Sequence, residues 1–430
     1  MVFVTGPFQA PDEGNHFFRA YQIAEGRLLA VRMGQKVGGW LPTEVGDVVA
    51  PFSYVPFHPD RKIDTALLST LVWKPVGRER TFVDYPNTAL NAPIAYLPQA
   101  AGIAIGRIFG LSALTMSYGG RLFSLSCFIC LLWLAIRTTP VFKWVMVLIG
   151  LMPMPLFLAA SLSSDTLING ASILLMALVL HASIGDTEEC LDPGSAGAIA
   201  GLCIILSMSK LVYAPLSGLV MIIPSLRFGG RIHKAAYCGG VMAAALAAAV
   251  LWGLEARSIY VNLYGSDAGK QLMLILTAPG MFVNALLNTF SLKWVAIKEM
   301  FVGVLGWADT NLPTWIWKTY PWALFMTAFL DSGKGHPLRA WQKAWLGIIC
   351  SLVLLLIATA MYLACTKPGA PVVEGIQGRY LTPLALPALL LFQNRMFPLR
   401  SRLPLGAVLT VYSTAVLGAT CFKLYMRYYG

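Results

Sequence analysis

Long apolar stretches alternate with short polar loops over most of this 430-residue chain. A helix needs about 20 apolar residues to cross the hydrocarbon core of a bilayer, and stretches near that length recur after residue 117. The pattern predicts an all-α, polytopic membrane protein whose helical bundle has about ten or eleven spans. The predicted spans, several short or interrupted by proline, cover residues 118–136, 143–160, 166–184, 195–208, 209–224, 236–254, 314–331, 344–366, 380–394 and 405–422.

Two long segments, residues 7–117 and 255–313, are not predicted to cross the membrane, and they hold most of the acidic residues. Each contains one apolar stretch, 93–112 or 279–297, that we interpret as an amphipathic helix lying on the membrane surface. We interpret the apolar residues 1–6 as the end of a first spanning helix whose remainder would precede them. The expected organisation is therefore 1–117, 118–254, 255–313 and 314–430.

Composition supports the membrane assignment, because 57% of the residues are hydrophobic and only 12% are charged. A soluble protein carries about 25% charged residues, so a water-soluble globule and a disordered chain are both excluded. In a membrane protein, an excess of basic residues such as the net charge of +12 is typical of cytoplasmic loops that lie beside anionic lipid. The chain has no basic stretch with interleaved aromatic residues, so nucleic-acid binding is not indicated.

Basic residues gather in four short loops that strict alternation places on one side. The excess of Lys and Arg marks that side as cytoplasmic, so both long segments are predicted to be external. The loop residues are Arg137 and Lys143; Arg227, Arg231 and Lys234; Lys334, Arg339 and Lys343; and Arg395, Arg400 and Arg402.

The first candidate site opens the first external segment with Asp12, Glu13, His16 and Arg19. Residues three and four apart share a helix face, so these side chains are expected to meet. The adjacent carboxylates suit a general base or a site for a hard divalent cation such as Mg²⁺ or Mn²⁺. The alternative is a helix start, with Asp12 as N-cap and Glu13 in the first turn.

Two further candidates lie at the external ends of predicted spans. Asp165 is followed by Asn169 one turn later, although Asp165 also suits a simple helix cap. Lys210 and Tyr213 follow a polar stretch inside the apolar run. Ionisable residues there are functional candidates, whereas a lysine that reaches toward the interface is the structural alternative.

Arg379 and Tyr380 follow Gly378 at the external edge of a span. A planar guanidinium binds phosphate oxygens in pairs, and a preceding glycine permits close backbone approach. Trp307 and Asp309 lie just before another span, where Trp is expected at the interface and an acidic residue is less expected.

Two other features are better explained by structure. Arg121 resembles Arg379 but is more typical of a contact with lipid head groups, and residues 85–98 are a proline-rich loop. No Walker A, Rossmann, H-E-x-x-H or G-x-S-x-G motif is present.

Taken in order, five motifs resemble one bacterial family of predicted membrane proteins that is related to GT-C glycosyltransferases. They are P-D-E-x-x-H (11–16), N-T-A-L-x-x-P-x-A-Y-L-P (87–98), S-S-D-x-x-x-N (163–169), G-V-L-G-W-x-D-T-x-L-P (303–313) and Q-G-R-Y-L-x-P (377–383). The resemblance implies a GT-C-like bundle in the bacterial inner membrane with its site on the external, periplasmic face. It also implies that Asp12 is the catalytic carboxylate, with Glu13 as its partner or substitute, and that Arg379 and Lys210 bind the lipid-linked phosphate.

The resemblance further implies the substrates: a sugar on polyprenyl phosphate, and a glycan or lipid of the cell envelope as acceptor. A transporter or flippase for lipid-linked saccharides is an alternative, although it would need polar groups near mid-membrane and two related halves. A non-catalytic assembly subunit of a polysaccharide system is another. The enzyme hypothesis requires Asp12, Asp165, Lys210, Asp309 and Arg379 to line one cavity.

Overall fold

The computed structural model describes residues 1–184, 189–331, 338–393 and 403–430. Helices dominate it, which confirms the predicted all-α polytopic architecture. Within the described residues, six helices are long and apolar enough to cross a membrane. They are α6 (Ala113–Thr138), α9 (Asp165–Ile184), α11 with its 3₁₀ extension η5 (Arg231–Ile259), α13 (Pro279–Gly303), α15 (Ala340–Ala364) and α17 (Leu403–Tyr428).

Shorter helices occupy the remaining predicted spans. The stretch 143–160 is broken before Pro153, and 209–224 forms a 3₁₀ helix that contains Pro215. Missing backbone donors at proline explain both irregularities. These elements are α7 (Lys143–Leu151), α8 (Pro153–Ala159), α10 (Pro193–Ser209), η3 (Leu211–Ile222), α14 (Thr314–Leu330), η6 (Gly378–Leu381) and α16 (Thr382–Leu390).

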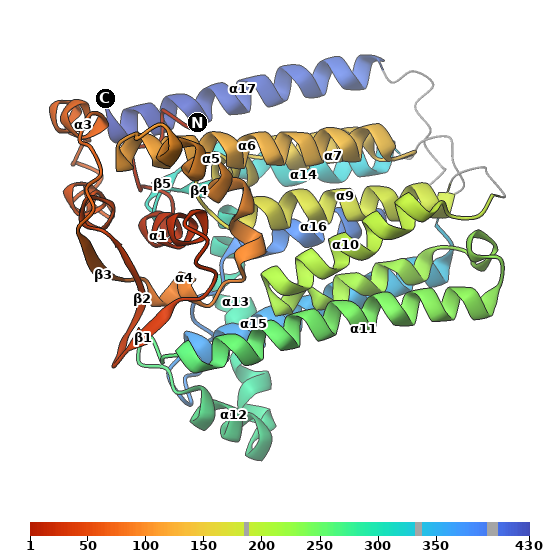
Figure 1. Cartoon of the computed structure of the whole chain (residues 1–430). Helices are drawn as coiled ribbons and strands as arrows, with labels where there is room; N and C mark the ends of the chain where they lie inside the picture. The colour runs from red at the N-terminus through yellow and green to blue at the C-terminus, as the bar shows by residue number, and fades with distance from the viewer. Residues whose placement is uncertain (185–188, 332–337, 394–402) are drawn as a thin grey trace.

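The helices of the bundle run roughly parallel, with α9 at the centre and α11 and α17 at the edges (Figure 1). In an apolar 18-residue stretch of α9, 72% is buried inside the protein, whereas 22% of the corresponding stretch of α11 is buried. Outer helices therefore present apolar side chains outward, as a lipid-facing surface requires. In contrast, α13 lies crosswise to the bundle beside α12 (Ala268–Thr277), at the end that carries the N-terminal sheet.

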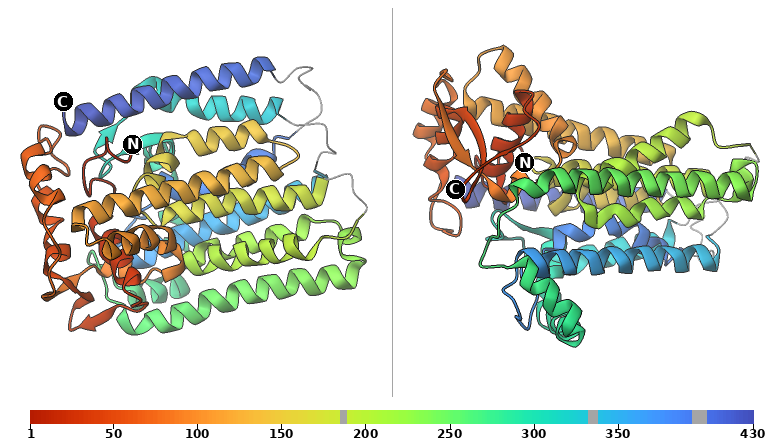
Figure 2. Two further views of the ribbon diagram at one scale, coloured as in Figure 1. Left: turned by 45° about the horizontal axis from the view of Figure 1, so that its top comes forward. Right: turned by 60° about the horizontal axis from the view of Figure 1, so that its bottom comes forward.

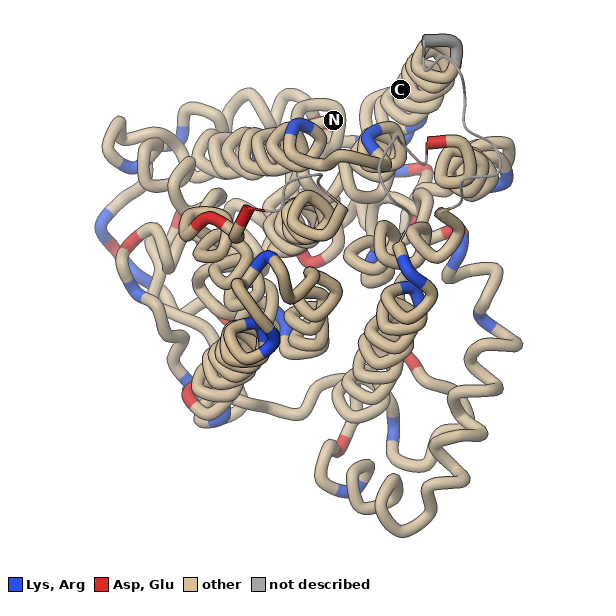
Figure 3. The backbone as a smooth tube through the Cα atoms, turned by 90° about the vertical axis from the view of Figure 1, so that its right-hand side faces the viewer, with Lys and Arg blue, Asp and Glu red and all other residues tan. Residues whose placement is uncertain are grey.

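We call that end of the bundle the sheet end and the opposite end the loop end. The N-terminal segment and both chain termini lie at the sheet end in every view (Figures 1 and 2). Figure 3 looks onto the loop end, where the described basic loops connect the bundle helices. Among the predicted loop residues, Lys334, Arg395, Arg400 and Arg402 lie outside the described residues.

The N-terminal segment contains a small antiparallel sheet that the apolar pattern did not predict. Its order is β1–β2–β3, with Met33 paired to Lys36 and Gly38 paired to Asp84. A second pair of strands, β4–β5, precedes α14. The strands are β1 (Val31–Met33), β2 (Lys36–Pro42), β3 (Arg80–Asp84), β4 (Val304–Leu305) and β5 (Thr310–Asn311).

Short helices cover this sheet and join it to the bundle. The longest are α1 (Glu13–Ala24) and α5 (Leu97–Ile108), and α5 falls inside the apolar stretch predicted to form a surface helix. The others are α2 (Thr43–Asp47), η1 (Ala50–Phe52), α3 (Thr65–Val72), α4 (Pro86–Ala89) and η2 (Pro93–Tyr96). Away from the sheet, η4 (Ser225–Phe228) leads into α11 and packs against it.

Candidate functional site

A cluster of charged side chains from four distant parts of the sequence forms at the sheet end. Its centre is Asp165, the first residue of α9, whose carboxylate accepts a hydrogen bond of 2.5 Å from Lys210 Nζ. The second carboxylate oxygen lies 3.7 Å from Arg379 Nε. The N–H of Asp165 donates to the Ser163 hydroxyl at 3.2 Å, while the Asp165 carboxylate faces the two cationic side chains.

Lys210 reaches the cluster from a break between two helices. The residue is extended (φ −152°, ψ 119°) where α10 ends and η3 begins. Its ammonium lies 5.1 Å from the ring centre of Tyr380, and the Tyr213 hydroxyl donates to the Tyr380 carbonyl at 3.0 Å. The predicted pairs Lys210–Tyr213 and Arg379–Tyr380 therefore meet at one point.

Arg379 depends on a close backbone contact at Gly378. A Cβ at residue 378 would lie 2.1 Å from the backbone nitrogen of Phe301 and 2.3 Å from the carbonyl oxygen of Ile297. Only glycine lets η6 lie this close to α13, as the sequence predicted. The guanidinium is buried, and its Nε has no hydrogen-bond partner among the described residues.

Asp12 contributes the second carboxylate of the cluster. It precedes α1 in a left-handed conformation (φ 57°), and its side chain makes no helix-cap hydrogen bond. Instead, the amide of Asn87 donates to Asp12 Oδ1 at 2.8 Å. Burial raises the pKa of Asp12 above its usual range, and the positive charges of Arg379 and Lys210 partly offset that effect.

His16 lies one turn after Asp12, beside the same charges. Its Nδ1 is 2.7 Å from the hydroxyl of Tyr96, which also accepts a hydrogen bond from the Asn91 amide at 2.9 Å. Burial, reinforced by Arg379, lowers the pKa of His16 to about 3, so the imidazole is neutral at physiological pH. Nδ1 of this neutral imidazole and the Tyr96 hydroxyl share one hydrogen bond, which holds the ring in place.

Glu13 and Arg19, in contrast, are occupied by structural contacts. Glu13 accepts two hydrogen bonds from Arg121, at 2.7 and 2.6 Å, and both side chains are almost fully buried. Arg121 also donates to the carbonyls of Val2, Thr5 and Gly6. Arg19 donates to Gln22 and to two backbone carbonyls. None of these described contacts involves Asp165.

Trp307 and Asp309 join a different part of the N-terminal segment. The carboxylate of Asp309 accepts hydrogen bonds from Arg427 and from the backbone of Phe57, both at 2.9 Å. The indole of Trp307 donates to the carbonyl of Phe8. Asp309 therefore links α17 to the N-terminal segment, and the described contacts do not connect it with the cluster.

Asn169 follows Asp165 by one turn of α9 and faces the same side of that helix. The residue is 1% exposed, and its Nδ2 has no partner among the described residues. A buried amide without a partner is unusual, because desolvating it costs about 1–3 kcal/mol.

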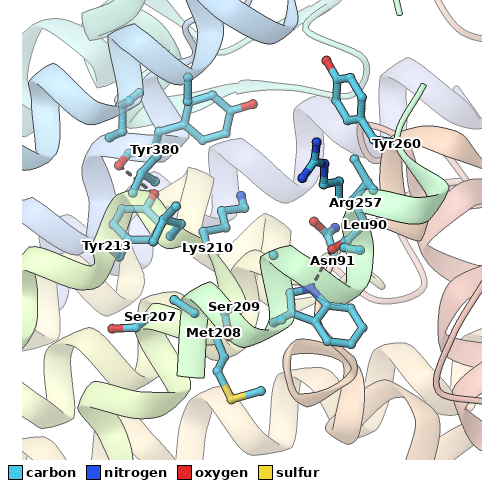
Figure 4. Close-up of a pocket in the computed structure, with 18 of the residues that line it drawn as sticks. Leu90, Asn91, Ser207, Met208, Ser209, Lys210, Tyr213, Arg257, Tyr260 and Tyr380 are labelled. Atoms are coloured by element: carbon cyan, nitrogen blue, oxygen red, sulfur yellow. Dashed lines mark hydrogen bonds between the residues drawn. The ribbon is translucent and has the colours of Figure 1, made fainter. Parts of the chain in front are cut away.

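A largely apolar cavity of about 740 Å³ opens beside Lys210 and Tyr380. Its polar lining is concentrated in Asn91, Lys210, Arg257 and Tyr260, and Lys210 and Arg257 reach toward its interior from different helices (Figure 4). The apolar wall comes from the sheet-end parts of η3, α11 and α15, for example Leu211, Val212, Ala249, Ile357 and Met361. This arrangement fits an amphiphile with an anionic head and an apolar tail.

The described residues include no group of three or more His, Cys, Asp and Glu side chains placed to hold a metal ion. Asp12 and Asp165 are two carboxylates in one cluster, but Asp165 already faces two cationic side chains. The positive groups suit an anion better than a divalent cation.

Sequence reasoning missed Asn87, Asn91, Tyr96 and Arg257. The first three lie in residues 85–98, which the sequence suggested to be a structural loop. Their side chains position Asp12 and His16. Neutral polar residues are common in any loop, so the sequence alone gives no sign of this role. Arg257, just after α11, is exposed and lines the cavity. From the sequence, an arginine at the end of an apolar helix is indistinguishable from one that only contacts the membrane interface.

Comparison with known proteins gives one match. The model of a family described as "Predicted membrane protein (DUF2142)" matches residues 1–388. No curated protein and no solved structure matches the chain.

Proposed function

We propose that this chain, which belongs to the DUF2142 family of predicted membrane proteins, is a GT-C-type glycosyltransferase. In this proposal it acts at the external, periplasmic face of the bacterial inner membrane. It takes a sugar from polyprenyl phosphate and transfers it to a hydroxyl group of a cell-envelope glycan or lipid. The observation that carries the proposal is the cluster of Asp12, Asp165, Lys210 and Arg379, which meets the apolar cavity at Lys210. The expectation that all five predicted residues line one cavity is not met, because Lys210 is the member of that set in the cavity lining and Asp309 lies elsewhere.

The donor would bind as a phosphate with an apolar chain. The cavity of about 740 Å³ accepts the first part of the chain, and Lys210 and Arg257 offer positive charge at its polar side. Arg379 adds a buried guanidinium next to Tyr380. Cationic groups fixed around a leaving phosphate stabilise the charge that develops on it, which is a large contribution to catalysis.

Asp12 is the general base in this proposal. Its carboxylate has one hydrogen bond from Asn87 and lies within the electrostatic reach of Arg379, Asp165 and Lys210. Glu13 is not assigned this role, because both of its oxygens are bound by Arg121. A pKa raised above the usual carboxyl value makes Asp12 a stronger base once it is deprotonated.

The reaction would proceed in one displacement. Asp12 accepts the proton of the acceptor hydroxyl while that oxygen forms a bond to the anomeric carbon. The bond between the anomeric carbon and the phosphate oxygen breaks, and polyprenyl phosphate departs with the electron pair. Attack opposite the leaving group inverts the anomeric centre. His16, neutral and hydrogen-bonded to Tyr96, would orient the substrate rather than transfer protons.

The proposed orientation of the protein in the membrane rests on the distribution of basic residues between its two ends. The sheet end holds the cluster, and the described basic loops lie at the opposite end (Figure 3). Lys and Arg retain loops in the cytoplasm, so the sheet end would face the periplasm. Labelling of an introduced cysteine, Ser53→Cys, with a membrane-impermeant maleimide in intact cells tests this; protection of that exposed position would contradict it.

The decisive experiment compares Asp12→Asn with wild type in cells of the source bacterium that lack the chromosomal copy. Mass spectrometry of envelope glycans and lipids should show a modification that wild type restores and Asp12→Asn does not. Asp60→Asn, an exposed aspartate, is the matched control and should restore it. Restoration by Asp12→Asn at normal protein levels would reject the proposed base.

A flippase would bind the same lipid but would not cleave it. Purified protein in detergent, given glycosyl polyprenyl phosphate and envelope extract as acceptor, should release polyprenyl phosphate. Binding without release would favour transport, and absence of binding would favour an assembly role.

A further inference from the structure

A second cavity, separate from the one beside Lys210, lies against the N-terminal segment. It measures about 580 Å³ and is formed by the end of α1, the loop before β3 and the turn between α5 and α6. Its charged lining residues are Glu25, Arg78, Arg80 and Arg107. Three arginines against one glutamate leave an excess of two positive charges in the lining.

The contacts within this cavity show which of the positive charges is compensated. Arg80 holds Glu25 with two hydrogen bonds, at 3.0 and 2.5 Å. Arg107 lies at 3.5 Å from the same carboxylate and stacks on Tyr21, with 5.4 Å between the guanidinium carbon and the ring centre. Arg78 is exposed, and its guanidinium makes no hydrogen bond or ion pair with the described residues. Glu44 lies nearby but accepts the backbone N–H of Gly77 at 2.9 Å.

The cavity is bordered by apolar side chains that a water-facing surface would not expose. Ile108 is 80% exposed, Phe109 is 74% exposed, and Leu111 lines the cavity itself. Trp73, on the loop that leads to the cavity, is 84% exposed. Ile108, Phe109 and Leu111 directly precede the spanning helix α6, so they lie where the membrane surface begins.

We propose that this second cavity binds the phosphate group of an anionic membrane lipid. Guanidinium groups bind phosphate oxygens in pairs, and positive side chains at a membrane surface attract anionic lipid. The exposed apolar residues would contact the acyl chains of the same molecule. This site is independent of the glycosyltransferase proposal, because its residues do not overlap with the Asp165 cluster or the first cavity.

The test measures binding to the purified full chain in neutral detergent. The probes are dihexanoyl phosphatidylglycerol, the zwitterionic dihexanoyl phosphatidylcholine, and inorganic phosphate. Isothermal titration should detect binding of phosphatidylglycerol and at least about tenfold weaker binding of the other two, because both charge and acyl chains contribute. Equal affinity for inorganic phosphate would overturn the lipid proposal in favour of a small-anion site.

Two variants locate the binding. Arg78→Gln removes no recorded intramolecular contact, so it should fold normally and weaken phosphatidylglycerol binding about tenfold. Arg231→Gln, an exposed arginine at the loop end, is the matched control and should bind like wild type. Glu25→Gln removes the one compensating charge and should strengthen binding. Equal losses in Arg78→Gln and Arg231→Gln, or no binding by wild type, would overturn the proposal.

Discussion

The carboxylate of Glu13 lies against the guanidinium of Arg121, with hydrogen bonds of 2.7 and 2.6 Å, although 108 residues separate them in the sequence. The neighbouring Asp12 has a different environment, since its carboxylate is bound by the neutral amide of Asn87. Two adjacent acidic residues therefore have separate roles. Glu13 attaches the N-terminal segment to α6, and Asp12 is available for chemistry.

This difference predicts that two conservative substitutions affect different properties of the protein. Glu13→Gln leaves the buried Arg121 without a counterion and should lower the free energy of unfolding by about 3–5 kcal/mol. Asp12→Asn should change stability by less than about 1 kcal/mol and abolish the proposed activity. Thermal unfolding in detergent measures the first effect, and envelope analysis measures the second. A stable Glu13→Gln protein would show that the ion pair is dispensable.

The pH dependence of activity should follow Asp12 and not His16. A general base works when it is deprotonated, so activity should fall as the pH is lowered through the raised pKa of Asp12, at a midpoint above 3.8. His16, whose pKa is about 3, stays neutral through that range. His16→Gln should therefore lower the rate without moving the midpoint. A midpoint near 6.5 that disappears in His16→Gln would contradict this assignment.

Gly378→Ala tests how Arg379 is positioned. The added methyl group would meet backbone atoms of Phe301 and Ile297 at 2.1–2.3 Å, so η6 must move away from α13. Such overpacking costs about 1–3 kcal/mol, and the displaced Arg379 should bind phosphate more weakly. Farnesyl phosphate binding measured by native mass spectrometry reports the second effect. Gly347→Ala, whose Cβ would meet nothing within 4 Å, should leave both properties unchanged.

Gly253→Leu tests the apolar cavity without disturbing the charges. Gly253 lines the cavity, and its Cβ would meet nothing within 4 Å, so a leucine fits but occupies the cavity. Replacing an exposed helical glycine should stabilise α11 by up to about 1 kcal/mol. Farnesyl phosphate binding should nevertheless weaken. Gly239→Leu, equally unobstructed on the same helix but outside the cavity lining, should keep wild-type binding; equal weakening in both variants would exclude the cavity as the binding site.

Apolar patterning predicted most of the bundle, because a spanning helix needs a long apolar stretch and little else in the chain has one. It could not predict β1–β3, whose strands are three to seven residues long and too short to show a clear alternation. The same pattern did not reveal that residues 211–222 wind as a 3₁₀ helix, since Pro215 alters the backbone without changing hydrophobicity.

The sequence indicated a shared location for candidate residues whose placement follows from the ends of helices. Asp165, Lys210 and Arg379 each begin or end an apolar stretch, and the structure brings their side chains together. The pairings of Glu13 with Arg121 and of Asp309 with Arg427 were not foreseen, because composition and spacing do not indicate which distant charges meet. Glu13 and Asp309, one from each pair, are residues that the sequence had suggested for the functional site.

Under the proposed function, the size of the first cavity determines how much of a lipid carrier the protein would recognise. At about 740 Å³ it holds a drug-sized molecule, far less than a long polyisoprenoid. A carrier bound by its phosphate would have only its head-proximal isoprene units in contact with protein, while the rest extends among the acyl chains. Saturation or geometry of those first units would then govern selectivity, and carriers differing only in overall length would be interchangeable.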